Sequence, residues 1–150
     1  MSSVNKCNIP EDLYYLVEKH VWAKLEGDVV IVGLTDVAQN LARTIISASL
    51  KAAGKRVKKG KSIATVESGK WVGPVPSPVN GEIVEINEVL ATAPSTINHD
   101  PYGEGWVAKI KFDDWQADSV DLVTGQDALR SYKEFLDAEG ISCEPIAHEG

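Results

Sequence analysis

The chain has 150 residues, 43% of them hydrophobic, and a formal net charge of -7. A chain of this length buries one ordinary core, so we expect one globular domain with short extensions. The acidic surplus argues against a surface that binds phosphate groups or nucleic acid. No stretch approaches the roughly 18 apolar residues of a membrane span. No apolar run follows residues 1–6, so we expect no signal peptide and a soluble, cytoplasmic protein.

The predicted elements follow in chain order from a lead-in segment over residues 10–19. Alternating or β-branched runs predict strands at residues 28–33, 44–50, 62–67, 81–86 and 106–112. Between the first two strands, residues 36–41 predict one or two helical turns with Thr35 as N-cap. Glycine and proline residues separate the runs, which is typical of a small barrel or sandwich.

The pattern changes near the C-terminus. Over residues 126–138, apolar side chains recur at helical spacing, which predicts an amphipathic helix ended by Gly140. We expect this helix to pack one face on the barrel, although a helix that binds a partner would show the same pattern. The residues of that face are Leu129, Phe135 and Leu136. Residues 141–150 are expected to form a loose tail.

The cysteines and histidines give no sign of a metal or redox site. Cys7 and Cys143 lie near opposite ends of the sequence, and neither has a partner at C-x-x-C spacing. We therefore expect two free thiols in a reducing compartment. His20, His99 and His148 show no ligand spacing, so we expect no metal. We expect His20 to be a packed structural histidine, with a cofactor contact as the alternative.

The most informative stretch surrounds Lys70, which follows a strand ending at Glu67 and precedes a proline-rich return. Gly69 allows a tight turn there. We expect it either to adopt a conformation that β-branched residues disfavour or to give a modifying enzyme access. A lysine at a hairpin tip is accessible, and an amide formed there removes its charge. Taken alone, however, the position is that of an ordinary surface lysine.

The wider context resembles the glycine-cleavage H-protein family of lipoyl carriers over about residues 15–112. The matching segments are residues 20–22, 32–39, 57–60, 66–70, 78–87 and 98–106. The resemblance implies a mainly β fold, the lipoyl-domain barrel-sandwich hybrid, with lipoate attached through an amide to Lys70. The residues it places around the cofactor are Glu67, Ser68, Gly69 and Trp71. On this basis we divide the chain into an N-terminal segment (1–14), a lipoyl domain (15–118) and a C-terminal helix with tail (119–150).

The sequence departs from the usual H-protein pattern at two positions where that family carries carboxylates. Val21 stands where the family usually has glutamate, and Pro74 where it usually has aspartate. In the family these carboxylates are associated with holding the amine of the aminomethyl-lipoyl intermediate. The 69–74 segment instead resembles lipoate-binding proteins of the sulfur-oxidising heterodisulfide-reductase-like system, whose dithiol is thought to carry sulfur.

These departures rank the functional hypotheses. We expect a lipoyl carrier for sulfur oxidation, with a glycine-cleavage carrier as the alternative and a non-lipoylated interaction module as the weaker one. None of these is an enzyme in itself, because partner enzymes act on the carried group. The implied partners are lipoate ligase or lipoate-assembly enzymes and a sulfur-oxidising heterodisulfide-reductase-like complex, with dihydrolipoamide dehydrogenase as a further candidate.

Two other cofactor hypotheses fail on spacing. Biotin carriers place their lysine between two methionines, but the only methionine here is Met1. Gly54 and Gly60 are separated by five residues rather than the four of a P-loop, so we expect no nucleotide site. The basic run from Lys55 to Lys61 predicts a solvated hairpin, with a docking patch for a ligase or a partner as the alternative.

Overall fold

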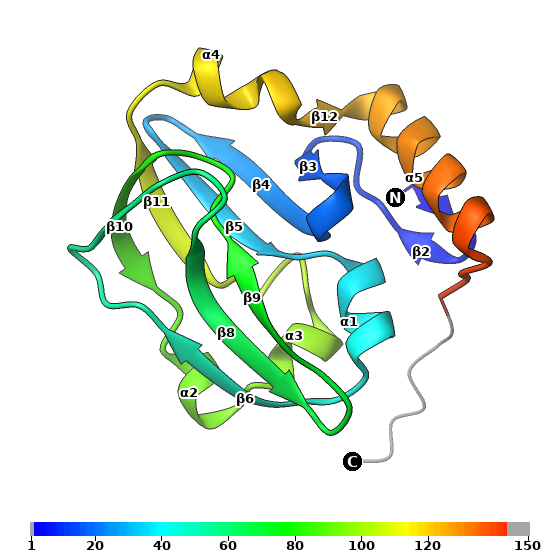
Figure 1. Cartoon of the computed structure of the whole chain (residues 1–150), viewed down its shortest axis with the longest axis horizontal. Coiled ribbons are helices and arrows are strands. Elements are labelled where there is room, and N and C mark those ends of the chain that lie inside the picture. The colour runs from blue at the N-terminus through cyan, green and yellow to red at the C-terminus, as the bar shows by residue number, and fades with distance from the viewer. Residues whose placement is uncertain (1, 144–150) are drawn as a thin grey trace.

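The computed structural model describes residues 2–143, whose strands form two main antiparallel sheets (Figure 1). The larger sheet has the order β12 (Val123–Thr124), β3 (Tyr14–Leu16), β4 (Val21–Glu26), β5 (Val29–Leu34), β11 (Ala108–Phe112), β10 (Gly81–Ile86) and β7 (Arg56–Val57). The smaller sheet has the order β6 (Ile45–Leu50), β8 (Ser62–Ser68) and β9 (Val72–Pro76). A separate N-terminal hairpin pairs β1 (Ser3–Val4) with β2 (Cys7–Asn8). The predicted mainly β class and the predicted strands are therefore confirmed.

Short helices connect these strands, and a helix of 15 residues follows the last strand. They are η1 (Val17–Lys19), α1 (Asp36–Ala42), α2 (Val89–Thr92), α3 (Thr96–His99), α4 (Trp115–Asp118), η2 (Ser119–Asp121) and α5 (Gly125–Glu139). The Thr35 side chain accepts a hydrogen bond from the Ala38 N–H at 3.2 Å, so the predicted N-cap of α1 is confirmed. Gly140 ends α5 in the left-handed conformation, with φ of 66°, as its position in the sequence predicts.

The main core lies between the two sheets. Inward-facing side chains of β8 and β9, among them Ile63, Val66 and Val75, are buried in one core with Ile83 and Ile110 of the larger sheet. Burying each such side chain contributes at most about 1.5–3 kcal/mol. This core fixes the β8–β9 hairpin, and with it the position of Lys70.

A second core lies outside the larger sheet, beneath α5. It joins the buried face of α5 to the N-terminal hairpin, β3 and the Trp22 indole. Tyr132 and Leu136 are buried at its centre, whereas Leu129 and Phe135 are only half-buried. The helix therefore packs, as expected, but mainly on an N-terminal layer rather than directly on the sandwich. Figure 1 shows α5 lying beside β2 and the N-terminus.

The expectation of two free thiols was wrong, because Cys7 and Cys143 form a disulfide. The two residues are separated by 136 positions, so no local spacing could indicate the pair. They meet because the segment after α5 follows the N-terminal hairpin: the Cys143 N–H donates to the Asn5 carbonyl oxygen at 3.0 Å. Residues 141–143 are thus held rather than loose, and residues 144–150 of the expected tail lie outside the described residues.

Two further searches cover only the described part of the chain. Within residues 2–143 no helix is both long enough and apolar enough to cross a membrane. The same range holds no group of three or more potential metal-ligating side chains. His148 lies outside it. The disulfide removes the cysteine argument for a reducing compartment, so the cytoplasmic location stays a prediction.

Candidate functional site

Lys70 is exposed at the tip of the β8–β9 hairpin, and Ser68 holds the turn that presents it. The Ser68 N–H donates to the Trp71 carbonyl oxygen at 2.7 Å, which closes the turn. The Lys70 N–H in turn approaches the Ser68 hydroxyl oxygen at 3.4 Å. Because Ser68 is buried while Lys70 is exposed, the backbone is anchored and the lysine side chain is free to carry a substituent.

Gly69 does not adopt the conformation proposed for it. Its φ lies outside the left-handed region, which among the described glycines is occupied at five other positions. A Cβ built on Gly69 meets no heavy atom within 4 Å. The conformational half of the prediction is therefore wrong, and only access for a modifying enzyme remains as a reason for glycine at this position.

Trp71 is held in place by a glycine two residues further on. Its indole lies against Gly73, where an added Cβ would stand only 2.7 Å from Cε2 of the ring. Trp71 remains 40% exposed, so one face of the indole is available beside Lys70. Glu67, in contrast, is exposed opposite Val72 on the hairpin and forms no side-chain hydrogen bond or ion pair with Lys70.

A groove of about 230 Å³ lies beside Lys70. Four parts of the chain form it: the end of η1, the end of β5, the helix α1 and the β8–β9 hairpin. Its walls include His20, Ala38, Leu41, Lys70, Trp71 and Pro74. The sequence did not indicate that α1 would form one wall, since its apolar residues are equally consistent with core packing. Leu41 of α1 is exposed, which shows that it lines the groove instead of packing in the core, but its exposure is known only from the fold.

His20 is a packed histidine, as expected, and its contact with a cofactor stays a prediction. Its backbone is left-handed, with φ of 59°, and its ring lies 5.1 Å from the Phe135 ring and 6.4 Å from the Tyr132 ring, centroid to centroid. The same residue lines the groove beside Lys70. Burial lowers the pKa of His20 from 6.5 to about 4, so the imidazole is neutral at neutral pH. The part of the groove wall formed by His20 is therefore a packed, uncharged imidazole.

None of the residues that line this groove is acidic. Pro74 is one of its walls, and Val21 is buried in the main core with 1% of its surface exposed. An ammonium group in the groove would therefore find no carboxylate acceptor, whereas an uncharged apolar ring would keep its favourable contacts. The lining of this groove therefore suits an uncharged, mainly apolar group.

Comparison with known proteins finds glycine cleavage H proteins similar to this chain in sequence and in structure. The family model described as "Glycine cleavage H-protein" matches residues 13–135. The chain is 51% identical over 138 residues to "Glycine cleavage system H protein 2" of Aquifex aeolicus, which covers 91% of this chain and 86% of that protein. It is 45% identical over 143 residues to "Probable glycine cleavage system H protein 2" of Sulfolobus acidocaldarius, with 93% and 95% covered.

A solved structure shows the same fold. The crystal structure of a glycine cleavage system H protein from Mycobacterium marinum matches with a TM-score of 0.72 and 31% identity. The match covers 89% of this chain and 100% of that one. The family match extends into α5, beyond the end of the resemblance found in the sequence at about residue 112.

Proposed function

The chain belongs to the glycine cleavage H-protein family, and we propose that it is a lipoyl carrier with lipoate attached through an amide to Lys70. Proteins of this family carry a covalently attached lipoate on a lysine. The observation that carries the proposal for this chain is the exposed Lys70 on an anchored hairpin tip, directly beside an apolar groove. A carrier needs this combination, because the lysine side chain with its lipoyl group (the arm) must reach partner enzymes and must also have a groove on the carrier in which to bind between reactions.

Different residues around Lys70 have different roles in a carrier. Ser68 fixes the turn, so that the attachment point does not move when the side chain does. Trp71 and Leu41 provide apolar walls for the groove. Lipoate, when bound, supplies a dithiol that cycles with a disulfide. As a carrier the chain is a substrate for partner enzymes, including lipoate ligase or lipoate-assembly enzymes, rather than an enzyme itself.

Glycine cleavage is the first candidate pathway. The relatives named above are glycine cleavage H proteins, which supports a role in shuttling an aminomethyl group between partner enzymes. The association with a sulfur-oxidising heterodisulfide-reductase-like complex, placed first from the sequence, gains no support from these relatives.

A sulfur cargo remains the second candidate because one observation favours it. The groove beside Lys70 has no acidic wall, and Pro74 occupies the position where an aspartate is usual in the family. A cationic amine would lose hydrogen bonds to water without gaining a carboxylate. A sulfane sulfur or thiolate cargo has no ammonium group, so it does not need a carboxylate acceptor in this groove.

The attachment is tested by producing the chain with an active lipoylation system and measuring its intact mass. We expect one lipoyl group per chain, none on Lys70→Arg, and an unchanged yield of the modification on the matched control Lys55→Arg. A native chain without lipoyl mass, or a modified Lys70→Arg variant, would contradict the proposal. The lipoylated protein is then placed in a reconstituted glycine-cleavage reaction beside a known H protein. Comparable methylene transfer supports the first pathway, and its absence favours the second.

A further inference from the structure

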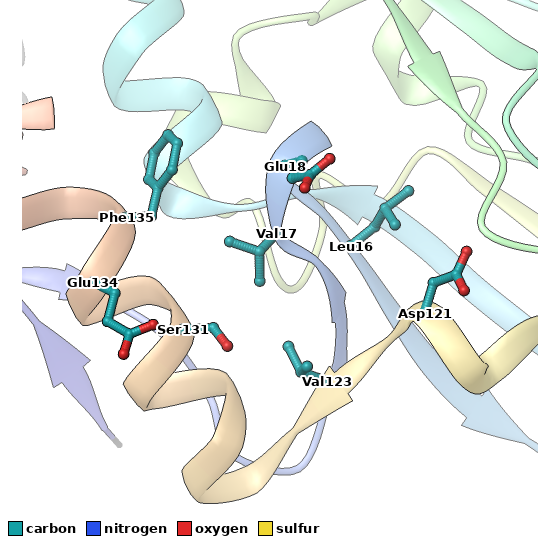
Figure 2. Close-up of a pocket in the computed structure, with 8 residues that line it drawn as sticks. All are labelled: Leu16, Val17, Glu18, Asp121, Val123, Ser131, Glu134 and Phe135. Carbon is teal, nitrogen blue, oxygen red and sulfur yellow. The ribbon is translucent and has the colours of Figure 1, made fainter. Parts of the chain in front are cut away.

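A second groove lies beside η1. It has a volume of about 640 Å³ and opens between η1, α5 and the η2–β12 segment. Its floor is apolar and half-buried, formed by Leu16, Val17, Val123 and Phe135. Figure 2 shows the carboxylates of Glu134 and Asp121 on opposite sides of this floor, with Glu18 near its end. We call it the acidic groove.

The charges around the acidic groove are unbalanced. No lysine or arginine is among the residues that line it. Asp121 forms an ion pair with Lys59 at 2.8 Å, outside the lining. Glu18 and Glu134 are exposed, and neither side chain has a hydrogen bond or ion pair within residues 2–143. The groove therefore offers two free carboxylates above an apolar floor, which suits a lysine or arginine whose aliphatic stem lies on the floor.

The acidic groove adjoins the Lys70 groove through consecutive residues. Glu18 lines the acidic groove, whereas Lys19 and His20, the next two residues, line the groove beside Lys70. The His20 ring contacts Phe135, which belongs to the wall of the acidic groove. An enzyme whose active site receives the arm from Lys70 therefore covers η1 and reaches the acidic groove at the same time.

We propose that the acidic groove is the docking site for the enzyme that reoxidises the carried dithiol, through a lysine or arginine flanked by aliphatic side chains. The inference rests on the proposed lipoyl carrier function. Whatever the cargo, a dithiol left after transfer must return to the disulfide. Two thiols lose two electrons and two protons as the S–S bond forms, and NAD⁺ is reduced to NADH with release of one proton. The docking enzyme is thus a dihydrolipoamide dehydrogenase.

Charge reversal tests the groove with the whole lipoylated protein. The probe is the host's own dihydrolipoamide dehydrogenase, assayed by NADH formation with the reduced carrier as the varied substrate. The groove variant is Glu18→Lys/Glu134→Lys. The matched control is Glu104→Lys/Glu139→Lys, which changes the net charge equally at exposed positions that line neither groove. Both variants are first checked for lipoyl mass and for an unchanged melting temperature.

We expect the groove variant to raise KM for the carrier at least about tenfold while kcat stays within about twofold, because exposed complementary charges act on encounter and docking. The control should keep both constants within about twofold. Raising the salt concentration should raise KM of the native carrier and have less effect on the groove variant. An unchanged KM in the groove variant, or an equal rise in the control, would overturn the docking site while leaving the carrier function intact. A native chain without lipoyl mass would overturn both.

Discussion

The indole of Trp71 rests on Gly73, so that no side chain can be added at position 73 without moving the ring. Gly73 is buried in β9, and its Cα forms the surface against which the ring lies. Trp71 therefore has a defined place beside Lys70, and the wall of the groove depends on a residue that is not itself in the groove lining.

Replacing Gly73 by alanine should therefore displace Trp71 and destabilise the hairpin. We expect Gly73→Ala to lower the free energy of unfolding by about 1–3 kcal/mol, the usual cost of overpacking a fitted site. The control is Gly69→Ala, four positions away, where an added Cβ meets nothing within 4 Å and should change stability by less than about 0.5 kcal/mol. Urea denaturation measures both, and equal stabilities would show that the ring moves aside freely.

The disulfide between Cys7 and Cys143 closes almost the whole chain into one loop. In the chain-entropy model, a loop longer than 100 residues stabilises the folded state by up to about 4–5 kcal/mol. Reduction, or the Cys7→Ser/Cys143→Ser variant, should lower the urea midpoint by a corresponding amount. The reductant alone should not change the midpoint of the double variant. Two titratable thiols in the native oxidised protein would contradict the pairing.

The difference between the cysteine prediction and the structure shows where sequence reasoning reaches its limit. The strands, the Thr35 cap and the end of α5 at Gly140 depend on neighbours within a few residues, so local patterns predict them. The contact between the N-terminal hairpin and the segment after α5 joins parts of the chain more than 130 residues apart, and no period or spacing encodes it.

The candidate site divides in the same way. Lys70 and Ser68 lie in one short segment, and the sequence predicts both the turn and the exposed lysine. The groove beside Lys70 is different, because His20, Leu41 and Pro74 come from three separate elements. Only the packing of η1, α1 and the hairpin brings them together. The acidic groove needs two further elements, α5 and the η2–β12 segment, and was not predicted at all.

The helix α5 is expected to contribute stability through its buried face. Leu136 is fully buried, so Leu136→Ala should cost about 2–5 kcal/mol. Val120→Ala is the control, because Val120 is 77% exposed and its loss should be nearly neutral. Lys70 should remain a substrate for lipoylation in both variants, since α5 packs on the N-terminal layer and not on the hairpin. Equal denaturation midpoints for the two variants would mean that α5 is not docked in solution.

His20 should make stability depend on pH. Its pKa falls from 6.5 in the unfolded chain to about 4 in the folded protein, because burial disfavours the charged form. The unfolded state therefore binds more protons between pH 4 and 6.5. The contribution is fully present above pH 6.5 and is lost as the pH falls toward 4. Allowing for partial exposure of the ring, the loss is about 1–3 kcal/mol.

The His20→Asn variant isolates this effect, because asparagine tolerates the left-handed backbone at position 20. The slope of stability between pH 4 and 6.5 should become smaller in this variant than in the native protein. His99→Gln is the control, since it also removes one imidazole but at an exposed position. An unchanged slope in His20→Asn would mean that the imidazole is solvated in the native state.

The cargo preference can be shifted at Pro74, which lines the groove beside Lys70 and is exposed. Pro74→Asp should place a carboxylate within reach of an amine carried on the arm and raise methylene transfer in the glycine-cleavage assay. Val21→Glu is unsuitable for this purpose, because Val21 is buried in the core and an unpaired carboxylate there would be costly. The matched control is Val72→Asp, on the same hairpin but outside the groove lining.

The two aspartate variants should differ in a manner that depends on pH. The gain from Pro74→Asp requires the ionised carboxylate, so it should disappear as the pH falls below about 4. Val72→Asp should leave methylene transfer unchanged throughout, because Val72 does not line the groove beside Lys70. If Pro74→Asp has no effect on a lipoylated protein that already transfers methylene groups well, the missing carboxylate does not limit the amine cargo. The groove would then no longer favour a sulfur cargo over glycine cleavage.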